Sequence, residues 1–281
     1  MRLPAENDCV WIRLDRLRVF MERVFVALGV PAADAAVCAD VLIMADRFGI
    51  DTHGINRLKP MYVDPIRRGV QDPVTRLEVV RETATTAVFD GHNGMGQVIA
   101  RRAMALAIEK AQRHGLGMTA VRNSNHYGIA GYYARMATDA GLIGITGTNA
   151  RPAVAPTFGV EAMLGTNPLC FGMPSDEPFP FVLDCATSMV QRGAVEIHAR
   201  RGTPVPPGWV IDAEGRSGAA DAQGVLSDLV AGRAALLPLG GAGKEGGGHK
   251  GYGYATVVEI LSAALQTGSF LHQLAAVEDG R

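Results

Sequence analysis

The sequence predicts a mixed α/β fold of the α+β type, in which helices and short strands follow one another without a regular repeat. Three observations carry this prediction. Apolar residues recur at helical spacing in several long runs. Short runs rich in β-branched residues lie between these helical runs. No expected strand leads through a glycine-rich turn into a helix, which argues against a Rossmann domain.

Glycine and proline residues mark the boundaries of the elements expected in the first half of the chain. Gly29, Gly49 and Gly115 each follow a run with helical spacing, and glycine commonly ends helices. Pro65 lies inside a short helical run, so we expect a kink or an early end there. The expected elements are helices over residues 14–28, 31–49, 58–69 and 98–112, and strands over residues 77–80 and 86–89.

The second half of the chain has shorter elements and more turns. Residues 202–224 are rich in Gly and Pro and predict a surface excursion, and a glycine-rich segment precedes the last helix. The expected elements are strands over residues 118–121, 142–146 and 179–183, and helices over residues 129–140 and 252–265.

Charge and cysteine content exclude several classes of protein. The chain has 27 Lys+Arg and 28 Asp+Glu, so it lacks the basic excess of a nucleic-acid-binding protein. Its apolar runs fall short of the roughly 18 residues of a membrane span, and its N-terminus lacks the apolar core of a signal peptide. The four separated cysteines indicate buried residues in a reducing cytoplasm, not a zinc site: Cys9, Cys38, Cys170 and Cys185.

Two glycine motifs resemble nucleotide loops but have the wrong context. Residues 115–120 match G-x-G-x-x-A, yet a helix is expected before them and a strand after them. Residues 240–244 resemble a P-loop, but Glu245 stands where a Mg²⁺-binding Ser or Thr is needed. The sequence therefore does not predict a Rossmann or Walker site.

A polar turn between two expected helices contains Thr52 and His53, with Arg57 four residues beyond the histidine. At the start of a helix these two side chains share a face. An arginine binds a carboxylate through two hydrogen bonds, and a histidine exchanges a proton with a carbonyl oxygen, as a 2-oxo acid reductase requires. The alternative is that Asp51 or Thr52 only caps a helix and His53 is incidental.

Three further polar segments are candidate sites. His126 lies in a loop after an expected strand, and Asp184 closes an apolar run. Asp184 either orients a histidine or caps a helix. Lys250 lies in the glycine-rich start of the last helix, where backbone N–H groups suit a phosphate. The alternatives for His126 and Lys250 are a surface turn and a simple helix start.

Taken together and in order, these segments resemble the type-2 malate/L-lactate dehydrogenase family. Relatives include ureidoglycolate, sulfolactate and piperideine-2-carboxylate oxidoreductases. The resemblance runs from about residue 10 to residue 268. The segments that carry it are residues 51–57, 124–128, 165–169, 184–188, 208–215 and 250–253.

The resemblance implies a non-Rossmann fold that binds NAD or NADP, with NAD favoured. A cofactor-binding domain with a largely antiparallel mixed sheet is expected over residues 73–251, with an inserted helical segment at about 91–116. A helical domain is expected from residues 10–72 and 252–281. The resemblance also implies a homodimer, a small-molecule substrate and no metal.

The resemblance further implies roles for individual residues. Thr52 and His53 with Asp184 form a proton relay in some relatives, whereas His126 is the proton acceptor proposed in the ureidoglycolate branch, and both assignments stay open here. Arg57 is expected to bind the substrate carboxylate. The residues expected to contact the cofactor are His126, Tyr127, Gly128, Ala150, Thr166, Asn167, Asp184, Cys185, Ala186, Lys250 and Gly251.

Three features depart from the family pattern. Ala194 stands where the family usually has lysine, and Pro65 lies in a helix where relatives have charged residues. The chain ends at Arg281, whereas relatives continue with an apolar strand and closing helices that contact the cofactor. The expectation is either a truncated sequence or a site that has lost a part.

The leading functional hypothesis is a hydride transfer between a nicotinamide cofactor and a small 2-hydroxy or 2-oxo acid, with malate or lactate first. One alternative is a cyclic imine reductase of the piperideine-2-carboxylate type on the same scaffold. A second alternative is a non-catalytic remnant that still binds a ligand.

Overall fold

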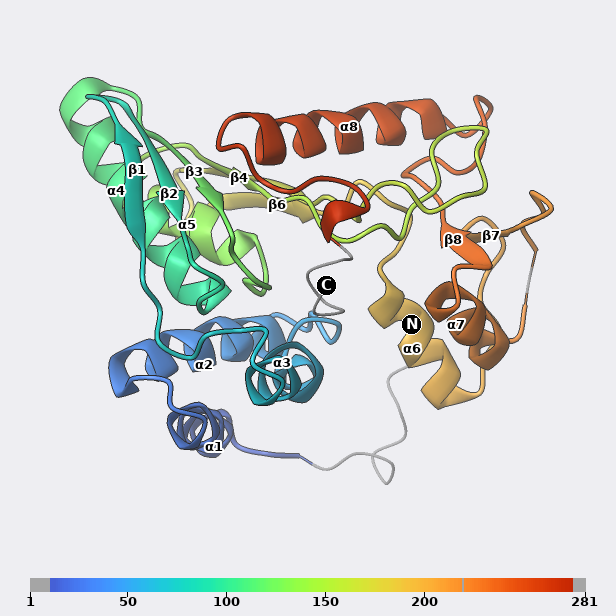
Figure 1. The fold of residues 1–281 in the computed structure, drawn as a ribbon, viewed down its shortest axis with the longest axis horizontal. Coiled ribbons are helices and arrows are strands. Elements are labelled where there is room, and N and C mark those ends of the chain that lie inside the picture. The colour runs from blue at the N-terminus through green and yellow to red at the C-terminus, as the bar shows by residue number, and fades with distance from the viewer. Residues whose placement is uncertain (1–10, 219, 275–281) are drawn as a thin grey trace.

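The computed structural model describes residues 11–218 and 220–274 of the chain. Small sheets lie in the middle of the molecule, with α1 (Leu14–Ala27) and α2 (Ala32–Arg47) on one side and α8 (Gly248–Ala264) on the other (Figure 1). Cys9 and the expected domain ends at residue 10 and residues 275–281 lie outside the described residues. The grouping of residues 252–281 with the N-terminal helices stays a prediction.

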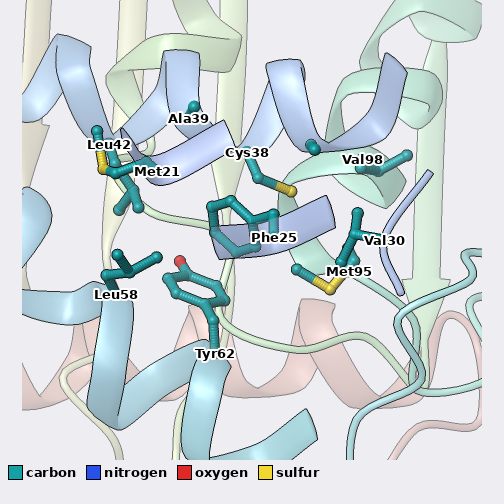
Figure 2. Packing of buried hydrophobic residues seen from close by; sticks show 11 residues of the cluster. Met21, Phe25, Val30, Cys38, Ala39, Leu42, Leu58, Tyr62, Met95 and Val98 are labelled. Atoms are coloured by element: carbon teal, nitrogen blue, oxygen red, sulfur yellow. The ribbon is translucent and has the colours of Figure 1, made fainter. Parts of the chain in front are cut away.

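The N-terminal helices pack around an apolar core that also receives the short helices after them. Figure 2 shows Phe25 of α1, Cys38 of α2 and the ring of Tyr62 together in this core. The expected interruption near Pro65 is confirmed, because the segment is divided into three short helices. These are η2 (Ile55–Arg57), the π-helix η3 (Lys59–Val63) and α3 (Asp64–Arg67). Proline has no N–H to continue an α-helical ladder, so the helix changes form there.

The first sheet has the order β1-β2-β3, with β1 (Glu78–Glu82) antiparallel to β2 (Thr86–Asp90) and β3 (Met118–Arg122) parallel to β2. The helix α4 (Gly96–His114) connects the two parallel strands and lies within the expected helical segment 91–116. Gly115 has a φ of 81° and ends α4. The G-x-G motif at residues 115–120 is thus a helix end followed by a strand.

The second sheet is antiparallel throughout, with the order β4-β5-β6. Its strands are β4 (Gly144–Gly147), β5 (Leu169–Met173) and β6 (Phe181–Cys185), and α5 (Gly131–Asp139) packs on them. The expected strand over 179–183 is shifted by two residues, so Asp184 lies within β6 and not after it. Cys185 is exposed, which corrects the expectation that it is buried.

The third sheet and its helices were not expected from the sequence, apart from a surface excursion. The strands β7 (Val210–Asp212) and β8 (Ala234–Leu236) pair antiparallel, beside α6 (Arg192–Arg201) and α7 (Ala222–Val230). Both strands are three residues long, too short for an alternating pattern to show. The carboxylate of Asp221 caps α7 by accepting a hydrogen bond from the N–H of Gly224 at 2.7 Å.

The last helix begins four residues earlier than expected, at Gly248. The mixed α/β fold is confirmed, and most strand pairs are antiparallel. Within residues 11–218 and 220–274, no helix has both the length and the apolar character needed to cross a membrane.

Candidate active site

The turn between α2 and η2 is shaped by Asp46 of α2. Its carboxylate accepts a hydrogen bond from the N–H of Ile55 at 3.0 Å. A Cβ atom at Gly54 would collide with this carboxylate, so the turn requires glycine at that position. This contact fixes where Thr52 and His53, just before Gly54, project from the turn.

The structure brings the two candidate histidines together. The rings of His53 and His126 stack with their centroids 5.8 Å apart and an interplanar angle of 17°. Both side chains are partly buried. Nδ1 of His53 lies 2.7 Å from the hydroxyl oxygen of Thr52. The two sequence segments that carried separate histidine hypotheses therefore form one imidazole pair.

Tyr62 completes this pair and was not expected as a site residue. Its hydroxyl oxygen lies 2.6 Å from Nδ1 of His126, and the two rings meet edge to face. The expected helix over residues 58–69 contains Tyr62 at an apolar position, so the sequence indicated only a core residue. A tyrosine hydroxyl in such a core needs a polar partner, which is the one signal that could have suggested this contact.

Burial and positive charge keep both imidazoles neutral near pH 7. Burial, with a smaller contribution from the charge of Arg57, lowers the pKa of His53 to about 4. Burial and the charges of His53, Arg57 and Arg151 lower the pKa of His126 to about 3. Loss of hydration disfavours the charged imidazolium, and nearby cations disfavour it further.

Arg57 is buried beside this pair and already has two partners. Its guanidinium donates to the carbonyl oxygen of Thr52 and forms a 2.8 Å ion pair with Glu196 of α6. Burial raises the pKa of Glu196, but the hydrogen bond and charge of Arg57, with help from Arg192, hold this pKa below its usual value. Glu196 was not expected as a site residue. Its only sequence signal is its place four residues after Arg192 on a helix.

Gly193 allows α6 to approach Arg57. A Cβ atom at Gly193 would lie 2.5 Å from Nη2 of Arg57 and 3.1 Å from Cβ of Thr52. Ala194 follows this contact directly. The α6 segment thus forms one wall of the site through its glycine and Glu196.

Asp184 forms a hydrogen bond with the backbone at the start of α5. Its carboxylate accepts a hydrogen bond from the N–H of Gly131, at the start of α5, at 2.6 Å. Among the described residues, no hydrogen bond or ion pair joins Asp184 to His53 or His126. The relay that links Thr52 and His53 to Asp184 stays a prediction.

The segments expected to contact the cofactor adjoin one another. The contact between Gly131 and Asp184 joins the start of α5, three residues after Gly128, to β6. The N–H of Thr187 donates to the carbonyl of Thr166 at 3.0 Å, and the N–H of Ala150 donates to the side chain of Asn167 at 3.1 Å. Segments that are distant in the sequence therefore form one continuous row.

The same row reaches the start of α8. The N–H of Leu239 donates to the carbonyl of Thr187 at 2.9 Å, and Gly251 packs so closely on Leu239 that a Cβ atom would collide with it. Lys250 is exposed beside Gly251. These segments offer the hydroxyl of Thr166, backbone groups and the cation of Lys250, and such groups fit the ribose and phosphate oxygens of a dinucleotide.

Asn167, one of the expected cofactor residues, is used by the fold itself, as is much of the glycine-rich segment before α8. The side chain of Asn167 is fully buried and donates to Glu259 and to the carbonyl of Ala255 in α8. Much of the glycine-rich segment packs on itself, since a Cβ atom at Gly248 would collide with the carbonyl of Gly241. Close backbone packing therefore accounts for these glycines without a ligand.

A large cavity elsewhere does not contain the imidazole pair. Its volume is about 490 Å³, and it lies between α4 and β3 on one side and α5 and β4 on the other. Tyr127 reaches its wall, but neither His53 nor His126 does. Among the described residues no three His, Cys, Asp or Glu side chains are placed to hold a metal ion.

Residues 12–281 match the family described as malate/L-lactate dehydrogenase. The chain is similar to a malate dehydrogenase of Pyrococcus abyssi, with 48% identity over 266 residues, which are 95% of this chain and 71% of the relative.

Solved structures are also similar. The crystal structure of malate dehydrogenase from Entamoeba histolytica has a TM-score of 0.93 and 43% identity, covering 96% of this chain and 74% of that one. The Δ1-piperideine-2-carboxylate reductase of Pseudomonas syringae has a TM-score of 0.82 and 30% identity, covering 93% of this chain and 75% of that one.

Proposed function

This chain belongs to the malate/L-lactate dehydrogenase family and is an oxidoreductase, and from this premise we propose that it interconverts a small 2-hydroxy acid and its 2-oxo acid, with malate or lactate as first substrates. One observation supports this most directly. Two neutral imidazoles, His53 and His126, stack with their centroids 5.8 Å apart, and the charge of the buried Arg57 helps to lower the pKa of each.

These groups match the needs of the reaction. When bound, a nicotinamide cofactor supplies the redox chemistry by exchanging a hydride with C2 of the acid. Arg57 binds the substrate carboxylate through guanidinium N–H groups that Thr52 and Glu196 leave free. A neutral imidazole takes the hydroxyl proton in oxidation, and the imidazolium returns it in reduction. Both histidines remain candidates for this proton transfer.

We also propose that the cofactor occupies the row formed by the 126–128, 150, 166–167 and 184–186 segments, with Lys250 near a phosphate. NAD is favoured over NADP. The adjacency of these segments and the polar groups they offer support the proposal. Because the side chain of Asn167 already donates to Glu259 and to the carbonyl of Ala255 in α8, it would hold these segments in place and not bind the cofactor directly.

A homodimer in the cytoplasm is part of the same proposal. Large apolar side chains are exposed on α1, including Val19 and Phe20, and on α8, including Ile260 and Leu261. Exposed apolar surface of this kind commonly marks an interface. The molar mass in solution, measured by light scattering, tests the dimer.

A substrate panel tests the activity. L-malate and L-lactate are offered with NAD⁺ or NADP⁺, and oxaloacetate, pyruvate and Δ1-piperideine-2-carboxylate with NADH or NADPH, while absorbance of the reduced nicotinamide is followed. A variant that carries both His53→Ala and His126→Ala is the control. Turnover of a hydroxy or oxo acid supports the proposal. Turnover of the imine alone favours the reductase, and NADH binding without any turnover favours the remnant.

A further inference from the structure

Nδ1 of His126 is contacted by a hydroxyl group and by a backbone N–H. The hydroxyl of Tyr62 lies 2.6 Å away, and the backbone N–H of Gly128 lies 3.4 Å away. A backbone N–H can only donate, so Nδ1 must offer it a lone pair. In a neutral imidazole the proton is then on the other nitrogen, Nε2.

Tyr62 is held as a donor by its own surroundings. Its side chain is 0% exposed, and its ring packs on Phe25 with the centroids 5.7 Å apart (Figure 2). Burial raises the pKa of Tyr62 well above its usual value, so the hydroxyl keeps its proton.

His53 does not have this constraint. Its Nδ1 faces the hydroxyl of Thr52 at 2.7 Å, and a hydroxyl can either donate or accept. His53 can therefore leave the lone pair of Nε2 free to take a proton. Among the described residues, Nε2 of neither ring forms a hydrogen bond.

We infer that Tyr62 is a positioning residue that fixes His126 in the Nε2–H tautomer, and that His126 donates a hydrogen bond to the C2 oxygen of the substrate without taking up its proton. The inference rests on the proposed function. In oxidation the hydroxyl proton moves to Nε2 of His53, and the electron pair of the C2–H bond leaves with the hydride. The C2–O bond then becomes a carbonyl that accepts the N–H of His126.

The charges around His126 also favour His53 over His126 as the residue that takes up the proton. His53, Arg57 and Arg151 each oppose a second proton on His126, and Tyr62 faces it as a neutral donor. A proton on His53 during the reaction would make protonation of His126 still less favourable.

The tautomer can be measured without activity. In the cofactor-free protein with ¹⁵N-labelled histidine, a two-bond ¹H–¹⁵N correlation spectrum at pH 7 separates protonated from unprotonated ring nitrogens. Loss of one signal set in His126→Gln assigns His126. We expect a protonated Nε2 and an unprotonated Nδ1, and a protonated Nδ1 would overturn the inference while leaving the proposed function intact.

Two substitutions at each histidine separate a donor from a proton carrier. A glutamine amide can donate a hydrogen bond, but it cannot take a proton at neutral pH. We expect His126→Gln to retain kcat within about 10-fold and His126→Ala to lose about 10²–10³-fold. We expect His53→Gln and His53→Ala both to lose about 10²–10⁴-fold. Equal losses in His126→Gln and His126→Ala would show that His126 carries the proton.

Tyr62→Phe removes only the hydroxyl. We expect kcat to fall about 10-fold with little change in KM, and the His126 signals to become those of a tautomer mixture. Tyr132→Phe is the matched control, since its hydroxyl donates to Asp40 at 3.1 Å and not to a histidine. An unchanged His126 spectrum in folded Tyr62→Phe would show that Tyr62 does not set the tautomer.

Discussion

Arg57 and Glu196 form a 2.8 Å ion pair although 139 positions separate them in the sequence. Glu196 also accepts a hydrogen bond from Arg192 at 3.1 Å, so one carboxylate lies between two guanidinium groups. The side chain of Arg57 is 10% exposed, and that of Glu196 is 18% exposed. The cation expected to bind substrate is therefore held in place by α6 before any substrate arrives.

Replacing Arg57 with Leu is expected to raise KM for monocarboxylate and dicarboxylate substrates alike. The lost charge-assisted hydrogen bonds correspond to about 1.5–3 kcal/mol. Steady-state kinetics with lactate and malate measures this change. Arg192→Leu is the matched control, because Arg192 is the other guanidinium beside Glu196. If KM rises only in the Arg192 variant, Arg192 and not Arg57 binds the substrate carboxylate.

Replacing Gly193 with Ala is expected both to destabilise the protein and to raise the KM for the hydroxy acid. The added methyl group would lie 2.5 Å from Nη2 of Arg57, so the guanidinium or α6 must move, which costs about 1–3 kcal/mol. Urea denaturation gives the change in the free energy of unfolding. Gly253→Ala in α8 serves as control, since no atom beyond its chain neighbours and the nearby backbone of α8 lies within 4 Å of its Cβ position. Equal stabilities of the two variants would contradict the close contact.

Replacing Lys250 with Ala is expected to weaken NADH binding by no more than about 1 kcal/mol, because an exposed charge is screened by solvent and salt. The affinity is measured by fluorescence quenching at two salt concentrations. Lys244→Ala provides an exposed lysine of the same segment for comparison. If both variants bind NADH like the wild type at low salt, the glycine-rich turn is only the start of a helix.

The free energy of unfolding is expected to fall as the pH drops from about 6.5 towards 4. The pKa values of His53 and His126 are lowered to about 4 and about 3 in the folded chain. In this window the unfolded chain binds more protons than the folded chain, so acid favours unfolding. The two partly exposed histidines together contribute about 1–3 kcal/mol.

Urea denaturation of the wild type and of the His53→Gln, His126→Gln double variant at pH 7 and pH 5 tests this dependence. The double variant lacks both titrating rings, so its stability is expected to change less between the two pH values. An equal change in both proteins would assign the acid sensitivity to other groups.

Local patterns were sufficient to place the long elements and the candidate loops. Periodic apolar residues and terminal glycines located α1, α2, α4 and α5 to within a few residues, and β2 and β3 followed from β-branched runs. The three-residue strands β7 and β8 and the helices α6 and α7 were missed. Their short strands and Gly/Pro-rich connections carry too few residues for a period to emerge.

The sequence by itself determined which residue types the site contains, because polar turns with histidine, arginine and glycine stand out against the apolar runs around them. Only the tertiary structure decided which of them meet. It stacked His53 on His126, gave His126 the buried Tyr62 as partner, and gave Asp184 the N–H of Gly131 as partner. These contacts join positions 53 or more apart, and no helical period, strand alternation or capping rule reaches across such separations. Packing between elements sets them, because a buried polar group must find its partner among whatever side chains the fold brings near.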